Sequence, residues 1–470
     1  MSKQYDDFLN LLKQKLNDCE DLIAHECGSV GARYALIYIK GITARDFVSE
    51  RLLRPLLKCD ISSFDGNFGA LLEATALRAP QNPNEAAESA VKGDVVIIAE
   101  SKNGFFATLA NAQYTHGRSI QEPSSDVTVR GAKSGFVEDA ETNMALIRKY
   151  IRTSDLKFLR FTVGSVSQTK VIMAFVSGRA EGRLVEELKQ RLSQIEASVI
   201  TDSANIAMLL SGSHDYIFQS CGSTEKVDKA ASKLMSGRIA VIVDGSPFVL
   251  TIPFVFAESI QASDDYLHTP YYATFIRFLR IVAFAAAIFA PAVLCAAVSY
   301  SYSEIPSELL GIISDSRKDI PLSFFWEIVA VLFLFEILRE VGVRMPRTVG
   351  DAVGIVGSII LGNTAVEAGI VSSVGVITVA FSAVCAFITP SYMYVIVLAR
   401  LGALLLAELF GIYGIGMAVA LLLLSLCGKV SFGVPYMTPL SPFTKSGMQD
   451  FIFAWPKKTI GRIEKLGGKR

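Results

Sequence analysis

The stretch IVAFAAAIFAPAVLCAAVSYSY, residues 281–302, contains no charged side chain. As a helix rising 1.5 Å per residue it spans about 30 Å, which is the thickness of the hydrocarbon core of a bilayer. Arg277 and Arg280 come just before it, so we expect its beginning on the cytosolic side. Pro291 should kink this helix, because proline has no N–H to donate. The stretch therefore predicts that the chain enters a membrane here.

The remainder of the chain divides around this point. Charged residues recur every few positions from Met1 to about Arg280, whereas Ile281–Cys427 contains long runs without any. The first residues, MSKQYDDFLNLLKQKLNDCE, are amphipathic and lack the basic start and apolar core of a signal peptide. We therefore expect a large cytosolic N-terminal region joined to a membrane domain.

Several function classes find no support in the motifs. The seven cysteines and four histidines are scattered, with no CxxC pair, and the cysteines are expected to be reduced. We find no Walker loop, no GxGxxG after a strand, no GxSxG and no HExxH. The sequence thus indicates a protein that is not an enzyme, with no cofactor, no metal site and no nucleic-acid partner.

The N-terminal region alternates strand and helix patterns. An amphipathic helix is predicted over 5–24, a strand and glycine turn over 32–41, a helix over 82–93, hairpins over 94–112 and 159–178, a helix over 181–195, and a strand–turn–strand unit over 237–253. This alternation predicts an α/β fold of two subdomains, 1–155 and 156–270. Gly93 and Gly237 open similar units whose first strands end in Glu100 and Asp244; this repeat could reflect a duplication, or only the fact that hairpins ending in Asp-Gly are common.

The stretch RGAKSGFVEDAETNMALIRKYIR, residues 130–152, allows two interpretations. Its glycines and basic residues could cradle a phosphate at a helix N-terminus. Alternatively it is a turn and a helix from about Val137, capped by Glu138 or Asp139, in which Asn143 and Arg148 satisfy local backbone or carboxylate groups. No Lys-Ser/Thr follows the glycines at the spacing that a phosphate loop requires.

The membrane domain is predicted over 271–430, followed by a basic cytosolic tail over 431–470. A polar loop over 303–321 should lie outside, and 322–347 should return to the cytosol. Glu327 and Glu336 are nine positions apart and point to opposite sides of an ideal helix. Arg339 can pair with Glu336 at i,i+3.

Further apolar segments follow over 352–371, 374–389 and 395–427. The last is too long for one span and is interrupted by Arg400, Glu408 and a glycine cluster over 411–416. Both chain ends are expected inside, which requires an even number of spans. We favour four, with parts of 322–341 or 395–427 re-entrant or interfacial, and keep six as the alternative.

Small residues at helical spacing and two polar side chains distinguish the segment 350–373. Asn363 and Glu367 are one helical turn apart, although a charge in lipid costs about 3 kcal/mol or more. They could form a hydrogen bond across packed helices, line a water-filled ion path, or bind a small molecule. The candidate pore or subunit-contact residues are Gly350, Gly354, Gly357, Gly362, Asn363, Val366, Glu367 and Gly369, and the candidate membrane polar network is Glu327, Glu336, Arg339 and Glu408.

Several stretches resemble the GerA family of spore germination proteins, A subunit. They are VRGAKSGFVEDAETNMALIRKYIR (129–152), VGSVSQTKVIMAFV (163–176), GRIAVIVDGSPFVLTIP (237–253), SDDY (263–266), LREVGVRMPRTVGDAVGIVGSIILGNTAVEAGIVSS (338–373) and VPYMTPLSP (434–442). The chain departs from the family pattern at Ala132 and Ser134, where RGPxEGF is usual. It departs again at Asn363, where an acid or glutamine is common.

The resemblance implies a subunit of a nutrient-germinant receptor in the inner membrane of a bacterial spore, with both termini on the cytosolic, core side. It implies a transporter-like B subunit and a lipoprotein C subunit as partners, besides the lipid bilayer. It also implies a homo-oligomer that forms a nutrient-gated cation channel. The alternatives are a secondary transporter of an amino acid or ion, for which the 411–416 break is the one helix-break candidate, and a non-conducting spore-membrane scaffold of the same family.

Overall fold

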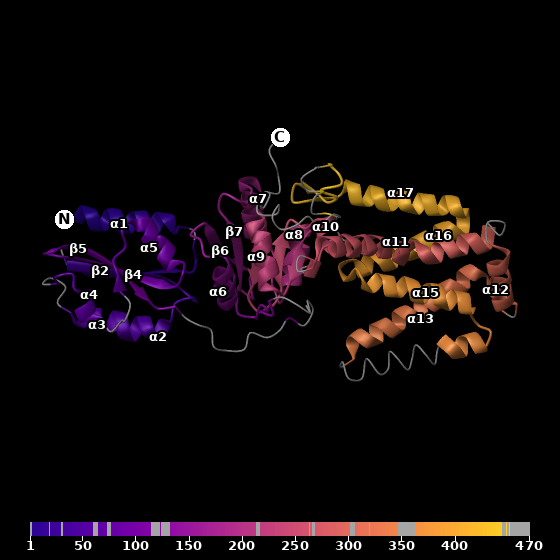
Figure 1. Cartoon of the computed structure of the whole chain (residues 1–470), viewed down its shortest axis with the longest axis horizontal. Coiled ribbons are helices and arrows are strands. Elements are labelled where there is room, and N and C mark those ends of the chain that lie inside the picture. The colour runs from indigo at the N-terminus through magenta and orange to yellow at the C-terminus, as the bar shows by residue number, and fades with distance from the viewer. Residues whose placement is uncertain are drawn as a thin grey trace.

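The computed structural model describes residues 2–17, 19–29, 32–59, 64–72, 77–113, 123, 132–212, 217–262, 264–265, 268–300, 306–318, 320–345, 362–443, 448 and 451. Figure 1 shows three regions in a row, namely two subdomains that each contain a sheet and then a region of long helices. The predicted fold class, an α/β region of two subdomains followed by a helical domain, is confirmed.

The first subdomain is built on a five-stranded antiparallel sheet in the order β1-β2-β4-β5-β3. Its elements are α1 (Ser2–Lys15), β1 (Leu22–Ser29), β2 (Ala32–Ile39), α2 (Arg45–Phe47), a π-helical segment (Val48–Leu53), α3 (Arg54–Lys58), α4 (Phe68–Leu71), β3 (Leu77–Arg78), α5 (Pro83–Ala90), β4 (Asp94–Ser101) and β5 (Gly104–Asn111). Helices α1 and α5 bury their apolar sides on one face of the sheet, and the segment from α2 to α4 covers the other. The predicted hairpin of β4 and β5 is confirmed, whereas the helix predicted over 5–24 ends at Lys15 because Leu22 already pairs with Ile39.

The second subdomain has five antiparallel strands in the order β6-β7-β9-β10-β8. Its elements are α6 (Ala140–Tyr150), β6 (Leu156–Val163), β7 (Thr169–Val176), α7 (Gly182–Ser193), α8 (Ser203–Ser211), β8 (Gly222–Thr224), α9 (Val227–Met235), β9 (Ile239–Val243), β10 (Val249–Ile252) and α10 (Phe256–Ile260). Helices α6 and α9 pack on one face of this sheet, and α7 and α8 pack on the other.

The two subdomains repeat one topology, since each sheet has the strand order first-second-fourth-fifth-third. The two glycines noted in the sequence occupy matching places, just before the fourth strand, with φ of 103° at Gly93 and 90° at Gly237. A Cβ on Gly93 would lie 3.0 Å from the carbonyl oxygen of Ile42, and one on Gly237 would lie 2.7 Å from that of Arg179. Ile42 and Arg179 each follow the second strand by three residues, so the same close approach recurs in both units.

Helix α6 lies on the second sheet, although the boundary predicted at residue 155 assigns it to the first subdomain. Its residues Met144 and Ile147 share a core with β6 and β7. Asp139 caps it by accepting from the Thr142 backbone N–H at 2.7 Å. Asn143 binds the Val137 backbone through both amide atoms. The turn-and-helix interpretation of residues 132–152 is thereby confirmed within the described residues.

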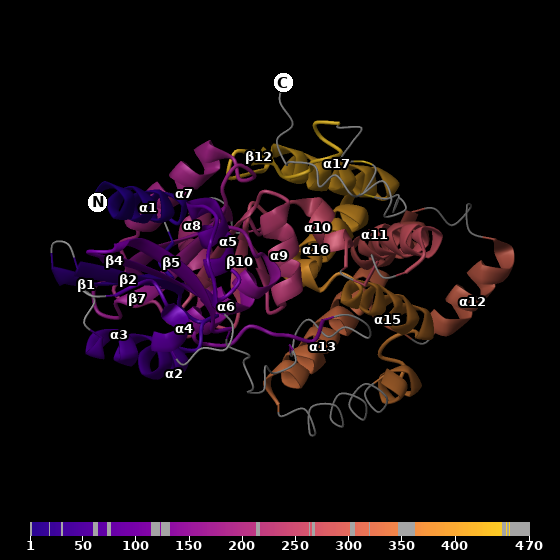
Figure 2. The same cartoon turned by 60° about the vertical axis from the view of Figure 1, so that its left-hand side comes forward.

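The helical region contains α11 (Pro270–Tyr300), α12 (Ser307–Arg317), α13 (Phe324–Arg344), α15 (Ser373–Phe387), α16 (Met393–Phe410) and α17 (Ile412–Gly428), followed by the short strands β11 (Val430–Ser431) and β12 (Val434–Pro435). In the described part of the chain, 270–300 and 390–410 are helices long and apolar enough to cross a membrane, and 373–387 and 412–428 are shorter apolar helices. In both views α12 lies at the end of the helical region away from the subdomains (Figures 1 and 2).

Side-chain contacts fix the directions of these helices. Glu327 at the start of α13 contacts Ser372 at the start of α15, and Phe335 lies 6.4 Å from Phe387 between ring centroids, so α13 and α15 are parallel. Helices α11 and α16 are parallel too. Phe284, in the first half of α11, packs against Tyr392 at the start of α16, and Tyr300 at the end of α11 donates to the Glu408 carbonyl near the end of α16. The predicted break over 411–416 is the turn between α16 and α17, with Gly411 at φ 59°.

Candidate functional site

The segment proposed for a pore or subunit contact is described from Gly362 onward, and Gly350, Gly354 and Gly357 lie outside the described residues. Residues 362–367 are helical. Asn363 and Glu367 are exposed, whereas Gly362, Val366 and Gly369 are half-buried.

This short helix closes on a glycine. The Ala368 and Gly369 N–H groups donate to the Thr364 and Val366 carbonyls at 2.8 and 3.0 Å. Gly369 has φ of 67°, a left-handed conformation that favours glycine at a helix end. The stripe of Asn363 and Glu367 thus sits on a terminated turn just before α15.

Glu327 of the predicted polar network lies where α12, α13 and α15 meet. Its side chain is 0% exposed. One carboxylate oxygen accepts the Ser372 backbone N–H at 2.8 Å and the Ser372 hydroxyl, and the other lies 3.4 Å from Nε of Arg317. A carboxylate at this place also faces the partial positive charge of the α15 N-terminus. Glu327 therefore connects three helices on the side of the region away from the subdomains.

The other network residues occupy separate places. Glu336 pairs with Arg339 at 2.7 Å, as the i,i+3 spacing predicts. Glu408 of α16 is half-buried and accepts from the Cys295 thiol at 3.4 Å and the Ser299 hydroxyl at 3.5 Å, both on α11. The structure therefore distributes the four predicted network residues over three clusters instead of bringing them together.

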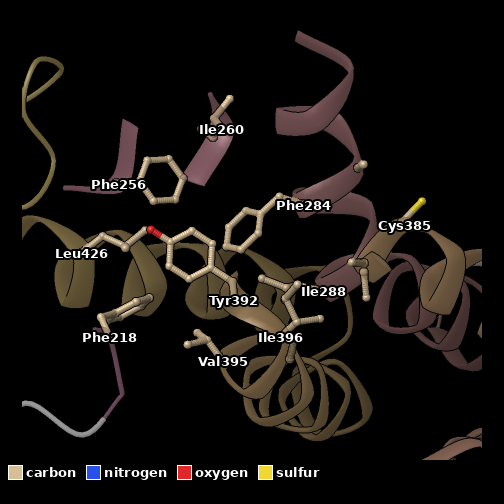
Figure 3. Packing of buried hydrophobic residues seen from close by; sticks show 14 of the residues in the cluster. Phe218, Phe256, Ile260, Phe284, Ile288, Cys385, Tyr392, Val395, Ile396 and Leu426 are labelled. Atoms are coloured by element: carbon tan, nitrogen blue, oxygen red, sulfur yellow. The ribbon is translucent and has the colours of Figure 1, made fainter. Parts of the chain in front are cut away.

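An aromatic cluster joins the second subdomain to the helices (Figure 3). Tyr392, at the start of α16, lies among Phe218 of the subdomain, Phe256 of α10 and Phe284 of α11, with its ring stacked 5.5 Å from that of Phe256. Its hydroxyl is 2.9 Å from that of Tyr436. Aromatic rings from elements far apart in sequence therefore hold the subdomain on the bundle.

Two ionic clusters surround this aromatic contact. Asp265 accepts from Arg277 at 3.2 Å and from Arg280 at 2.7 and 2.9 Å. On α10, Glu258 pairs with Lys233 at 2.7 Å and with Arg238.

The pKa values of the second cluster follow from its surroundings. Burial lowers the pKa of Lys233 to about 8, against the opposing charge of Glu258. Burial alone would raise the pKa of Glu258, but Arg238 and Lys233 outweigh it and lower the pKa.

The sequence did not reveal the roles of the aromatic and charged residues that join the second subdomain to the helices. It also did not reveal the role of Arg400, which it shows only as an interruption of the apolar segment 395–427. Arg400 is 2% exposed within the bundle. Pro291 was the available signal, because a proline frees the carbonyl four residues earlier and another group must bind it.

The described residues contain no group of three His, Cys, Asp or Glu side chains that could hold a metal, and the seven cysteines are free thiols.

The described residues thus form an α/β double subdomain that is locked to a bundle of apolar helices containing buried charges, which is the architecture of a membrane protein with a soluble head. A profile of the Bacillus/Clostridium GerA spore germination proteins matches residues 10–465. The chain belongs to this family, and the resemblance to its A subunits is confirmed. Membership also makes the chain a non-enzymatic protein.

Individual relatives extend over most of the chain. Spore germination protein KA of Bacillus subtilis (strain 168) is 35% identical over 454 residues, covering 94% of this chain and 83% of that protein. The uncharacterized membrane protein YfkQ of the same strain is 32% identical over 432 residues, covering 91% and 84%. A crystal structure of the N-terminal domain of the A subunit of the Bacillus megaterium spore germinant receptor GerK3 is 26% identical, with a TM-score of 0.38, covering 53% of this chain and 94% of that one.

Proposed function

We propose that the chain is the A subunit of a nutrient-germinant receptor in the spore inner membrane, and that it oligomerises into a cation channel opened by nutrient. The observation that carries this proposal is the exposure of Asn363 and Glu367 on a single copy of the chain. A carboxylate and an amide in an apolar region require a protein or water neighbour. A second copy of the chain, or a pore shared between copies, would supply one.

Aromatic side chains at both ends of the helices support a membrane placement. Tyr271, Tyr272 and Tyr394 are exposed at the end near the subdomains, and Tyr300, Trp326 and Tyr413 are exposed at the other end. Tyrosine and tryptophan favour the two membrane–water interfaces. These belts support a bundle that crosses the bilayer with the subdomains on the cytosolic, core side.

Helix directions support six passages rather than four. Helices α13 and α15 both run toward the subdomains, so Met345 lies at the end of the bundle near the subdomains and Ser372 lies at the far end. One proposed passage between these two positions, together with α11, α13, α15, α16 and α17, makes six. An even number of passages is what two termini on the core side require. The segment that contains Asn363 and Glu367 then belongs to the third passage or its far end.

In this arrangement the A subunit acts with a transporter-like B subunit and a lipoprotein C subunit. Nutrient bound by the partner shifts a closed oligomer toward an open one, which requires tighter binding to the open form. The soluble head is held to α11 and α16 by the aromatic cluster, so it moves with the helices that would gate the pore.

The test replaces Glu367 in spores that carry this chain as their copy of the receptor subunit. We expect Glu367→Ala and Glu367→Gln to slow the release of monovalent cations, and then of dipicolinate, after nutrient addition. The matched control is Glu340→Gln, which changes an exposed carboxylate of α13 that pairs with Arg344 at 2.7 Å. Normal release in both Glu367 variants would remove this residue from the mechanism.

A second experiment tests the channel itself. Spores that lack the chain should fail to release cations for some nutrients and respond normally to others. Failure for every stimulus would favour the scaffold, and substrate uptake by the purified chain alone would favour the transporter. If every nutrient response stays normal, the proposed receptor role is wrong.

A further inference from the structure

Helix α11 continues through Pro291, but one of its backbone hydrogen bonds cannot form there. Because proline has no N–H, the carbonyl of Ala287, four residues earlier, loses its helical donor. Ala287 is fully buried, so water does not replace that donor. A buried carbonyl without a partner is costly, and the fold has to provide one from elsewhere.

Two other helices provide it. The hydroxyl of Ser382 on α15 donates to the Ala287 carbonyl at 2.7 Å. Nε of Arg400 on α16 donates to the same oxygen at 2.9 Å. Both side chains are buried, so three helices are joined at one backbone atom.

Arg400 brings more than this carbonyl requires. The serine hydroxyl alone would satisfy it, yet a full positive charge is buried beside it. Within the described residues Nη1 of Arg400 has no hydrogen-bond partner, and no carboxylate is ion-paired with this guanidinium. A buried cation that is only partly satisfied gains from a second acceptor.

Pro291 lies between two halves of α11 that contact opposite ends of α16, and of these only the first half also binds the head. The first half is bound to the head, since Arg277 and Arg280 hold Asp265 and Phe284 packs against Tyr392. The second half is bound to the end of α16, where Cys295 and Ser299 donate to the Glu408 carboxylate and Tyr300 donates to its backbone carbonyl.

We propose that Pro291 is a hinge between the head-bound and far halves of α11, and that Arg400, with Ser382, is the latch that holds it in the resting arrangement. Release of the latch breaks the two hydrogen bonds that the Ala287 carbonyl accepts from Arg400 and Ser382. The physiological meaning of this latch rests on the proposed channel function, in which hinge movement belongs to opening. The latch itself does not depend on that function.

The first test is a double-mutant cycle on the full-length chain purified in detergent, using Pro291→Ala, Arg400→Met and both together. Alanine restores the N–H at 291, so the Ala287 carbonyl no longer needs Arg400. The effect of Arg400→Met on the unfolding equilibrium constant should therefore differ between the two backgrounds by about 2- to 150-fold, the range for residues in one network. Additive effects would overturn the latch.

Two further variants keep the test decisive if Arg400→Met fails to fold. Ser382→Ala is the milder change, and it should also be non-additive with Pro291→Ala. Arg344→Met removes an exposed arginine from the end of α13 and should be additive with Pro291→Ala. If Ser382→Ala proves additive as well, the carbonyl of Ala287 is not the joint.

Spores test the functional part separately. We expect Ser382→Ala, or Arg400→Met where the protein accumulates, to raise cation release in the absence of nutrient several-fold over wild type. Unchanged basal release together with a non-additive cycle would leave a structural joint and refute its gating role. Absence of nutrient-dependent release in the wild type would instead contradict the proposed function, while the cycle still reports on the latch.

Discussion

The contact between the two subdomains contains a buried ion pair, and both of its residues lie outside the membrane region. Arg148 of α6 donates to Asp21, just before β1, at 2.9 Å from Nε and 3.0 Å from Nη2. Neither side chain is exposed by more than 2%. Nη1 of Arg148 also donates to the Thr153 and Leu156 carbonyls at 3.3 Å. We predict that Asp21→Asn and Arg148→Met each loosen the subdomain contact strongly.

The magnitude follows from the geometry in two ways. Two charge-assisted hydrogen bonds are lost, at about 1.5–3 kcal/mol each. Breaking a buried pair by removing one partner costs about 3–5 kcal/mol, because the other charge stays buried. The two free-energy values agree. A loss of 3–5 kcal/mol corresponds to roughly a 150- to 5,000-fold change in the equilibrium constant for opening the contact between the subdomains.

The two single variants should differ in their pH dependence. Burial raises the pKa of Asp21 even though Arg148 opposes the shift. Without Arg148 that carboxyl can take up a proton instead of remaining charged, so the penalty of Arg148→Met should shrink as the pH falls. The guanidinium left unpaired by Asp21→Asn stays charged at every pH of the experiment, so the destabilisation by Asp21→Asn should persist as the pH falls. The double variant Asp21→Leu with Arg148→Met should recover most of the loss, because it leaves no buried charge unpaired.

Hydrogen exchange measures this opening locally. The Glu20 N–H donates to the Phe158 carbonyl across the contact at 3.1 Å, and its exchange should accelerate by the factor above, limited by global unfolding. The matched control is the Ile97 amide in the centre of β4, which should change far less. Acceleration of less than about fivefold at Glu20 in both single variants, which is about 1 kcal/mol, would refute the role of the pair.

Three further changes test other parts of the structure. A Cβ on Gly414 would lie 1.9 Å from the Leu406 carbonyl oxygen, so Gly414→Ala should destabilise the α16–α17 turn by about 1–3 kcal/mol or more in thermal unfolding. The control is Gly416→Ala, which should not destabilise it, because a Cβ on Gly416 would meet no atom within 4 Å. Glu327→Leu leaves the buried Ser372 N–H unpaired and should be about 1–3 kcal/mol less stable than Glu327→Gln, which keeps an acceptor; equal stabilities would contradict the bond. Between pH 8 and 10.5 the unfolded chain retains a Lys233 proton that the folded chain has released. The free energy of unfolding of wild type relative to Lys233→Met should therefore rise with pH, by up to about 1.4 kcal/mol per pH unit. A difference between the two proteins that does not change with pH would refute the lowered pKa of Lys233.

Local chemistry explains which elements could be predicted. The β4–β5 hairpin follows from two apolar runs around Lys102-Asn103-Gly104, and α5 follows from Pro83 near its start and Gly93 just past its end, all within one short window. The helix predicted over 5–24 ended early because β1 pairs with β2, a choice made by the sheet and not by the periodicity of the segment. The domain boundary at 155 missed α6 for a similar reason, since its apolar side fits either sheet until the contacts are known.

The candidate site shows the same division. The sequence by itself determined that the chain carries a charged head and apolar helices, that Glu336 could pair with Arg339, and that polar residues near 363–367 needed a neighbour. These features arise from residues within a few turns of one another, where spacing sets geometry. Only the tertiary structure decided that Glu327 binds Ser372, that Arg148 binds Asp21, and that Arg400 reaches the carbonyl freed by Pro291. Those partners are brought together across more than 40 positions by the packing of helices and sheets. A charged residue within an apolar segment of the sequence therefore indicates that a partner is required. The packing of the chain determines which residue becomes that partner.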